Sequence, residues 1–176
     1  MESVKVVVTG PFNAGKTTFI RTVSEITVLS TERKVSNASS AGDETTVAMD
    51  FGRITIDEDI VLYLFGTPGQ ERFSFMWETL SEGMLGFIIL LDAASTDSVK
   101  EAGGILEFFQ GLSDVPYVVA ANRADGDESA LAGIRQELGV DNGVRVLSCN
   151  ALEKDSVKNV LLGLLYDILD RVEVDG

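Results

Sequence analysis

Apolar positions recur along the chain in two alternating patterns, short continuous runs and stripes at helical spacing. The runs predict six strands, at residues 4–8, 47–56, 60–65, 84–91, 117–121 and 144–147. The stripes between them predict helices, of which the last, from Val157 to Leu169, is the most regular. Strands that alternate with helices predict an α/β fold with a doubly wound, mostly parallel six-stranded sheet and helices on both faces.

Two features depart from this alternation. A short acidic turn separates the runs at 47–56 and 60–65, which predicts a hairpin and therefore one antiparallel strand. Gly52 interrupts the first of these runs, which allows a β-bulge. Residues 30–45 are rich in Ser, Asn, Gly and charge, and they predict a long loop that responds to a ligand.

Composition narrows the class of protein. The chain has 176 residues, is 45% hydrophobic and shows no internal repeat, so we expect one domain over residues 1–176. A net charge of −14 disfavours nucleic acid and anionic membranes as partners. The one cysteine, Cys149, cannot form an internal disulfide, which favours a cytoplasmic location. Neither a signal peptide nor a lipidation motif is readable, so no intrinsic membrane anchor is expected.

The segment from Gly10 to Thr17 matches the pattern G-x-x-x-x-G-K-[ST] between a predicted strand and a predicted helix. In this arrangement backbone N–H groups and the positive end of the helix surround a phosphate, and Lys16 reaches the outer phosphates of a nucleotide. Thr17 offers a hydroxyl to Mg²⁺. The candidate phosphate ligands in this cradle are Asn13, Ala14, Gly15, Lys16, Thr17 and Thr18.

Four more segments follow in order, each at the end of a predicted strand or in the long loop. They are residues 46–51 (TVAMDF), 69–73 (GQERF), 122–125 (NRAD) and 149–151 (CNA). Together with the cradle they resemble the Ras-like small GTPases across nearly the whole chain. Residues 50–54 and 64–73 are most similar to the prokaryotic branch that includes MglA-like and conservon-type GTPases.

The resemblance implies a role for each matching residue around the phosphates of GTP or GDP. Lys16 would bind β- and γ-phosphate oxygens, and the hydroxyls of Thr17 and Thr46 would hold Mg²⁺ in the triphosphate state. The N–H of Gly69 would bind the γ-phosphate, and Gln70 would orient the attacking water. Lys16, Thr46 and Gln70 are therefore the candidate catalytic residues.

The same resemblance implies a guanine site. Asp125 would accept protons from guanine, Asn122 would brace the site, and the N–H of Ala151 would donate to guanine O6. Arg123, in place of the usual lysine, could stack along the base, and Asn150 stands at the position of the usual serine. Adenine leaves these partners unpaired, a penalty that can reach about 10⁴-fold, so GTP is favoured over ATP.

Three departures from the family pattern affect the expected chemistry. Gly66 stands where most relatives carry the aspartate that holds Mg²⁺, and Asp50 is the candidate substitute, although it fits equally well as a solvent-facing strand residue. Phe12 occupies a cradle position that is often glycine and should crowd Gln70, which predicts slow hydrolysis. No arginine clearly reaches the γ-phosphate; Arg33, Arg53 and Arg72 are candidates only because they lie near the two nucleotide-sensitive segments.

These observations predict a switch in which Mg²⁺ and GTP order the segments from Ser36 to Thr46 and from Gly66 to Trp77 for effector and regulator proteins. The resemblance suggests a small roadblock-type regulator. Apolar residues at 73 and 75–77 would either form a partner surface or pack under the neighbouring helix. The alternative is a pseudo-GTPase that holds nucleotide and barely hydrolyses it; a P-loop kinase would need an acceptor site and a basic lid, and the sequence has neither.

Overall fold

A single seven-stranded sheet forms the centre of the computed structural model. The structure describes residues 2–36, 44–69 and 74–175; for residues 29–36, 44–48 and 173–175 it describes the backbone only. The strands lie in the order β2-β3-β4-β1-β5-β6-β7. Only β3 runs against the others, because it is antiparallel to both β2 and β4 while the remaining pairs are parallel. The strands are β1 (Glu2–Thr9), β2 (Leu29–Ser36), β3 (Glu44–Thr55), β4 (Ile60–Gly66), β5 (Gly86–Asp92), β6 (Tyr117–Asn122) and β7 (Val146–Cys149). The expected fold class is confirmed.

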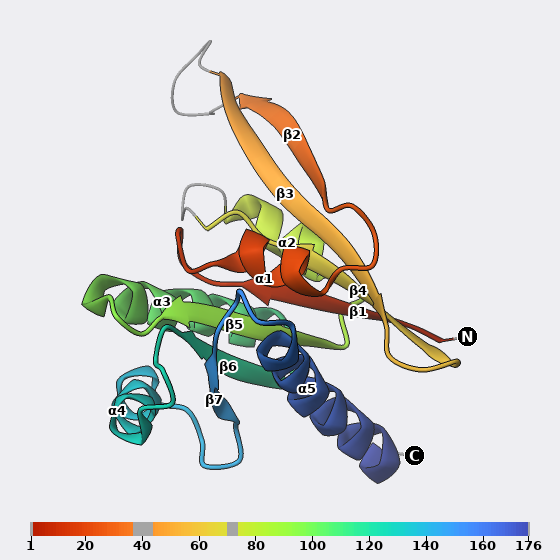
Figure 1. Ribbon diagram of the computed structural model, residues 1–176. Helices are drawn as coiled ribbons and strands as arrows, with labels where there is room; N and C mark the ends of the chain where they lie inside the picture. The colour runs from red at the N-terminus through yellow and green to blue at the C-terminus, as the bar shows by residue number, and fades with distance from the viewer. Residues whose placement is uncertain (1, 37–43, 70–73, 176) are drawn as a thin grey trace.

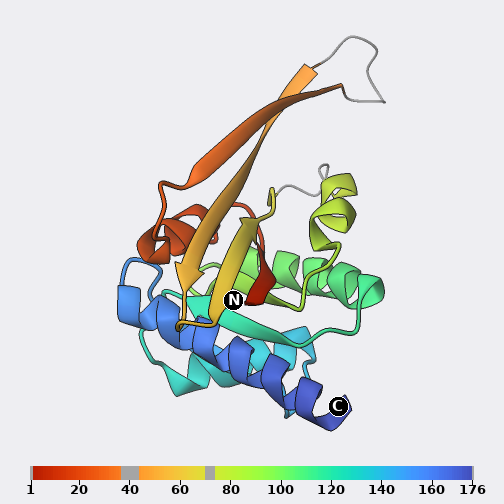
Figure 2. The ribbon, with the colours of Figure 1, turned by 90° about the vertical axis from the view of Figure 1, so that its right-hand side faces the viewer.

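The strand count is one higher than the sequence predicts. β2 forms within the segment expected to be a loop, and it pairs with β3 from Leu29 opposite Phe51 to Ser36 opposite Glu44. Leu29 and Val35 are its only apolar residues, so backbone pairing rather than an apolar face defines this edge strand. Figures 1 and 2 show β2 and β3 extending together away from the body of the molecule.

Helices cover both faces of the sheet, as Figures 1 and 2 show. They are α1 (Lys16–Val23), α2 (Phe75–Ser81), α3 (Thr96–Leu112), α4 (Glu128–Leu138) and α5 (Lys154–Asp175). One core lies under α1 and α5, and a second lies under α2, α3 and α4. Among the described helices, none combines the length and the apolar character that crossing a bilayer requires.

The central strand β1 is almost continuously apolar in sequence because it is buried on both faces. Val6 and Val8 point into the core under α1 and α5, whereas Val7 points into the core on the opposite face, and all three are buried. Successive side chains of a strand alternate between faces, so a strand covered on both faces needs apolar residues at every position. The carboxyl ends of β1, β4, β5, β6 and β7 consequently share one edge of the sheet, where ligands bind in this architecture.

Gly52 does not form the bulge that the sequence allows. The β3–β4 pairing is continuous from Asp50 opposite Gly66 to Thr55 opposite Val61. A Cβ atom at position 52 would lie only 2.6 Å from Cγ2 of Ile20 on α1. The glycine therefore permits the close approach of α1 to β3.

Candidate functional site

The cradle predicted at residues 10–17 forms the turn between β1 and α1. Gly15 precedes the helix with φ of 106°, a left-handed conformation that glycine adopts without strain. A side chain here would also meet Nδ2 of Asn122 at 2.7 Å from its Cβ. The first N–H groups of α1 have no partner within the helix, so this end of α1 provides donors and positive potential for an anion.

Lys16 lies buried at the floor of the cradle. Its Nζ donates to the carbonyl oxygens of Gly10 and Pro11, both at 2.7 Å. Burial lowers the pKa of Lys16 from 10.5 to about 8, and the nearby negative charge of Asp50 partly opposes this shift. An ammonium group has three protons to donate, so a third remains for a phosphate oxygen.

Thr17 contacts a carboxylate from another strand. Its Oγ1 donates to Oδ2 of Asp50 on β3 at 2.5 Å. This hydroxyl and carboxylate are the oxygen ligands that Mg²⁺ prefers, so the residues present fit that ion. Within the described residues no group of three or more histidine, cysteine, aspartate or glutamate side chains is arranged to hold a metal ion.

The segment that follows β4 lies against the cradle. A Cβ atom on Gly69 would be 2.5 Å from the backbone N of Phe12 and 2.7 Å from Nζ of Lys16, so Gly69 lies directly against the cradle. Gln70 lies outside the described residues. Thr46 belongs to β3, where it pairs with Lys34, but its side chain is outside the description.

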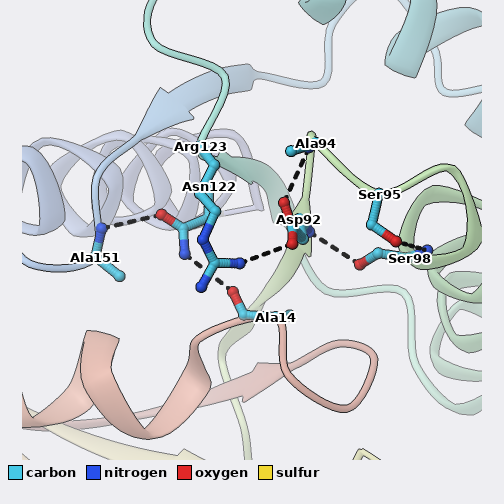
Figure 3. Close-up of polar contacts among 8 residues, drawn as sticks. All are labelled: Ala14, Asp92, Ala94, Ser95, Ser98, Asn122, Arg123 and Ala151. Carbon is cyan, nitrogen blue, oxygen red and sulfur yellow. Dashed lines mark hydrogen bonds and ion pairs between the residues drawn. The ribbon is translucent and has the colours of Figure 1, made fainter.

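Asn122, buried at the end of β6, links the cradle to the loop after β7 (Figure 3). Its Nδ2 donates to the carbonyl oxygen of Ala14 at 3.1 Å, and its Oδ1 accepts from the N–H of Ala151 at 3.2 Å. The hydroxyl of Thr22 on α1 adds a second link by donating to the carbonyl oxygen of Ala151. The phosphate side and the predicted base side therefore form one connected unit.

Arg123 pairs with a residue that the motifs do not include. Its Nη1 lies 2.8 Å from Oδ2 of Asp92 at the end of β5, and Oδ1 of Asp92 accepts from the N–H of Ala94 at 2.9 Å (Figure 3). This ion pair positions the guanidinium of Arg123 beside the turn after β6 that also carries Asp125. Asp92 is the first polar residue after a buried apolar run, and that position at the sheet edge is the signal that could have identified it.

Asp125 lies two residues further on, in the turn after β6. Both Arg123 and Asp125 have positive φ, 64° and 51°, a conformation that is uncommon for residues other than glycine. The Asp125 carboxylate is exposed and has no hydrogen-bond partner among the described residues. Such strained turns cluster at ligand sites, so the turn is a sound candidate for recognition.

The loop after β7 uses its polar groups internally. Oδ1 of Asn150 accepts from the N–H of Leu152 at 3.0 Å, and the N–H of Asn150 donates to Oγ of Ser156 at 2.8 Å. The N–H of Ala151, expected to donate to guanine O6, donates to Asn122 in this structure. Leu152, beside these groups, is 79% exposed, and its apolar side chain is therefore available to cover one face of a base.

Phe12 lines a cleft rather than the interior of the cradle. Its ring is 60% exposed, and the cleft, of about 520 Å³, lies between the cradle, α2 and α3. Trp77 is buried in the cleft wall with its Nε1 donating to the carbonyl oxygen of Pro68 at 2.8 Å, whereas Phe75 is exposed. Of the apolar residues predicted to serve either packing or partner binding, Trp77 thus packs and Phe75 faces solvent.

Arg53 is placed away from the phosphates. It lies three positions after Asp50 on β3, and side chains three apart on a strand face opposite sides of the sheet. Its carbonyl oxygen accepts from the N–H of Glu25, beyond the end of α1. The side chain of Arg53 therefore lies on the opposite face of the sheet from Asp50; the side chains of Arg33 and Arg72 lie outside the description.

A glycine-containing cradle between a central parallel strand and a helix, with a buried lysine at its floor, defines a P-loop nucleotide-binding protein. The sequence profile of the family described as "conserved hypothetical ATP binding protein" matches residues 31–160. The chain belongs to this family. The match begins after the cradle and includes the turn with Asp125 and the loop with Ala151.

The relatives of the chain include an uncharacterized protein and two small GTPases. Uncharacterized protein MJ1339 from Methanocaldococcus jannaschii is 34% identical over 124 residues, 70% of this chain and 72% of that protein. Ras-related protein RABE1d from Arabidopsis thaliana is 29% identical over 136 residues, 73% of this chain but only 63% of its own length. ADP-ribosylation factor-like protein 3 from Saccharomyces cerevisiae is 23% identical over 171 residues, 91% of this chain and 83% of that protein. The chain is thus a distant homologue of small GTPases.

Proposed function

We propose that this chain is a GTP-binding switch that hydrolyses GTP slowly, of the prokaryotic MglA-like and conservon-type branch and acting in the cytoplasm. The observation that carries the proposal is the bridge made by Asn122, which holds the phosphate cradle and the loop of Ala151 together. A protein that only bound phosphate would not need this link between the two sides. The homology to small GTPases supports the same function.

Guanine is the base that the exposed carboxylate of Asp125 fits. A carboxylate only accepts hydrogen bonds, and guanine presents two neighbouring donors, N1–H and the exocyclic amine, where adenine presents an acceptor at N1. A site built for such donors discriminates by up to about 10⁴-fold against a base that lacks them. The pair Arg123–Asp92 keeps a planar guanidinium beside the same turn.

Hydrolysis would depend on charge and on positioning of water. Lys16 and the N-terminal N–H groups of α1 would stabilise negative charge on the outer phosphates, and the N–H of Gly69 would hold the γ-phosphate. Gln70 would orient the attacking water. Bound Mg²⁺, with Thr17 and Thr46 among its ligands, supplies further neutralisation of the phosphate charge.

Partners would bind the two segments that the sequence predicts to be nucleotide-sensitive, residues 36–46 and 66–77. The exposed ring of Phe75 and the cleft lined by Phe12 and Phe108 support a protein partner there, because aromatic residues dominate such contacts. A roadblock-type regulator is the partner that the family resemblance suggests. A partner that supplied an arginine would raise the rate by about 10³- to 10⁵-fold.

A pseudo-GTPase is the second candidate, and the absence of a carboxylate at Gly66 favours it. Single-turnover GTP hydrolysis without a partner separates the two. A switch should turn over at about 10⁻⁴ s⁻¹, the order found for small GTPases alone. Gln70→Leu should slow this rate, because the attacking water would lose its orienting group. Phe12→Gly tests the crowding of Gln70 that the sequence predicts, and it should raise the rate.

Tyr166→Ala, which removes an exposed aromatic from α5, is the control and should leave the rate unchanged. Fast hydrolysis by the wild type that is indifferent to Gln70→Leu would contradict the mechanism. Bound GTP that stays intact in the wild type and in Phe12→Gly would establish the pseudo-GTPase instead.

A further inference from the structure

The hydrogen bond between Thr17 and Asp50 ties the start of α1 to β3. Thr17 donates its hydroxyl proton to the carboxylate, at 2.5 Å from Oγ1 to Oδ2. Because the proton is committed to Asp50, the lone pairs of the hydroxyl oxygen remain for a cation beside the phosphates. In P-loop proteins Mg²⁺ is held by this hydroxyl together with an aspartate at the end of a neighbouring strand.

The neighbouring strand β4 supplies no such aspartate. It ends at Gly66, which lies directly opposite Asp50 in the β3–β4 pairing. A Cβ atom on Gly66 would be 2.9 Å from Cδ1 of Ile20, 3.2 Å from Cβ of Asp50 and 3.5 Å from Oδ2 of Asp50. The side chain of Asp50 thus occupies the space that a side chain at position 66 would enter.

We propose that Asp50 is the carboxylate that holds Mg²⁺ in this protein. It would do so from β3, at the position paired with Gly66, in place of an aspartate at the end of β4. The inference rests on the proposed function, because the nucleotide phosphates must supply most of the remaining ligands. Mg²⁺ is usually bound in this way, through one or two carboxylates plus substrate phosphates.

The charges around the cradle agree with this placement. Lys16 and Thr17 are consecutive residues at the start of α1, and the carboxylate of Asp50 accepts from the hydroxyl of Thr17. A carboxylate near both Lys16 and Thr17 lies beside the outer phosphates. An edge-strand acid that only faced water would contact neither.

The relocation has a mechanical consequence for the switch. The carboxylate lies on the strand that continues into the extended β2–β3 hairpin, four residues after Thr46 (Figure 1). Four residues of strand span about 13 Å, so Thr46 would have to move toward the cradle to join Asp50 at the same metal. Loss of the metal would remove the link between α1 and β3 at Asp50, while the contacts of α1 with Gly52 and Arg53 further along the strand would remain.

The test measures dissociation of N-methylanthraniloyl-GDP from the full chain, in a Mg²⁺ series and in EDTA. Mg²⁺ should slow dissociation from the wild type. Asp50→Asn keeps the size of the side chain and its ability to accept from Thr17 but removes the charge. The Mg²⁺ concentration for half-maximal slowing should rise about 10- to 100-fold, with the rate in EDTA unchanged.

Asp59→Asn, which removes an exposed charge from the β3–β4 turn, is the matched control and should behave as the wild type. The exchange variant, Asp50→Gly with Gly66→Asp, returns a carboxylate to β4 and should recover Mg²⁺-dependent slowing. A Mg²⁺ dependence unchanged in Asp50→Asn would overturn the proposal, as would a folded exchange variant that ignores Mg²⁺. If the wild type binds the labelled ADP and not the labelled GDP, the guanine proposal fails and the Asp50 test is carried out with the labelled ADP. If the wild type binds neither nucleotide, both the guanine proposal and the Asp50 proposal are overturned.

Discussion

Lys16 is the residue whose chemistry the fold changes most. Its pKa is lowered to about 8 because burial disfavours the charged form. In the unfolded chain the pKa returns to about 10.4, so the unfolded state binds more protons between those values. The free energy of unfolding of the nucleotide-free protein should therefore rise with pH across that window.

Nucleotide binding should consequently take up a proton at alkaline pH. An anionic phosphate favours the charged form of Lys16, so binding at pH 9 should approach one proton taken up per nucleotide, whereas binding at pH 7 should take up almost none. Affinity should fall above pH 8. Calorimetric titration in two buffers of different ionisation enthalpy measures the uptake.

Lys16→Arg is the control for this proton uptake, because a guanidinium stays charged throughout the range. It should show no uptake at either pH. Zero uptake by the wild type at pH 9 would contradict a buried lysine at the cradle floor whose pKa is lowered to about 8.

At the residue scale the sequence predicted which residues lie at the site better than it predicted which contacts they make. The spacing of G-x-x-x-x-G-K-[ST] predicted that Lys16 and Thr17 face one ligand, and the structure places both on the cradle. The contact of Thr17 with Asp50 depends on the β3–β4 register, and the pair Arg123–Asp92 depends on the order of β5 and β6. A sequence does not fix strand register or neighbours by pattern alone, so these contacts required the structure.

At the element scale the buried strands were predictable and the edge strand was not. β1, β5 and β6 are covered on both faces, which demands continuous apolar runs. β2 is held by backbone pairing to β3 and therefore leaves no apolar signature. β7 lies two residues later than expected, at Val146–Cys149 instead of 144–147, because a short partly buried strand has weak boundaries in sequence.

The packing of α1 on β3 gives a prediction at this scale. Gly52→Ala would place Cβ 2.6 Å from Cγ2 of Ile20 and 3.0 Å from Oγ of Ser24. The Oγ of Ser24 accepts from the N–H of Arg53, so the added methyl group disturbs a hydrogen bond as well as packing. The free energy of unfolding should fall by about 1–3 kcal/mol, measured by chemical denaturation.

Gly133→Ala provides the matched control. Position 133 lies inside α4, and an added Cβ would have no neighbour within 4 Å. Replacing glycine by alanine in a helix interior should raise stability by roughly 0.5–1 kcal/mol. Equal effects of the two substitutions would show that close approach of α1 does not explain Gly52.

At the scale of the whole molecule, a protein with a net charge of −14 must bind a polyanion. The cradle overcomes this unfavourable field locally, through the N-terminus of α1 and the buried charge of Lys16. Asn122 then ties this positive site to the turn that carries Asp125 and Arg123. In the proposed function, phosphate affinity and base recognition would be properties of adjoining parts of the molecule, and they can be tested separately.

The family description refers to ATP, whereas the small GTPase relatives and the Asp125 turn favour guanine. In the proposed function Asp125 would decide between them, because its carboxylate matches the donors of guanine and not the acceptor of adenine. Asp125→Asn should lower affinity for GTP and shift preference toward xanthosine triphosphate. Glu128→Gln, which removes another exposed charge nearby, should leave the preference unchanged.

Calorimetric titration of the full chain with GTP, GDP, ATP and ADP in the presence of Mg²⁺ tests the central claim most directly. The account predicts that both guanine nucleotides bind far more tightly than their adenine counterparts, by up to about 10⁴-fold. Equal affinity for ATP and GTP, or a preference for ATP, would contradict it.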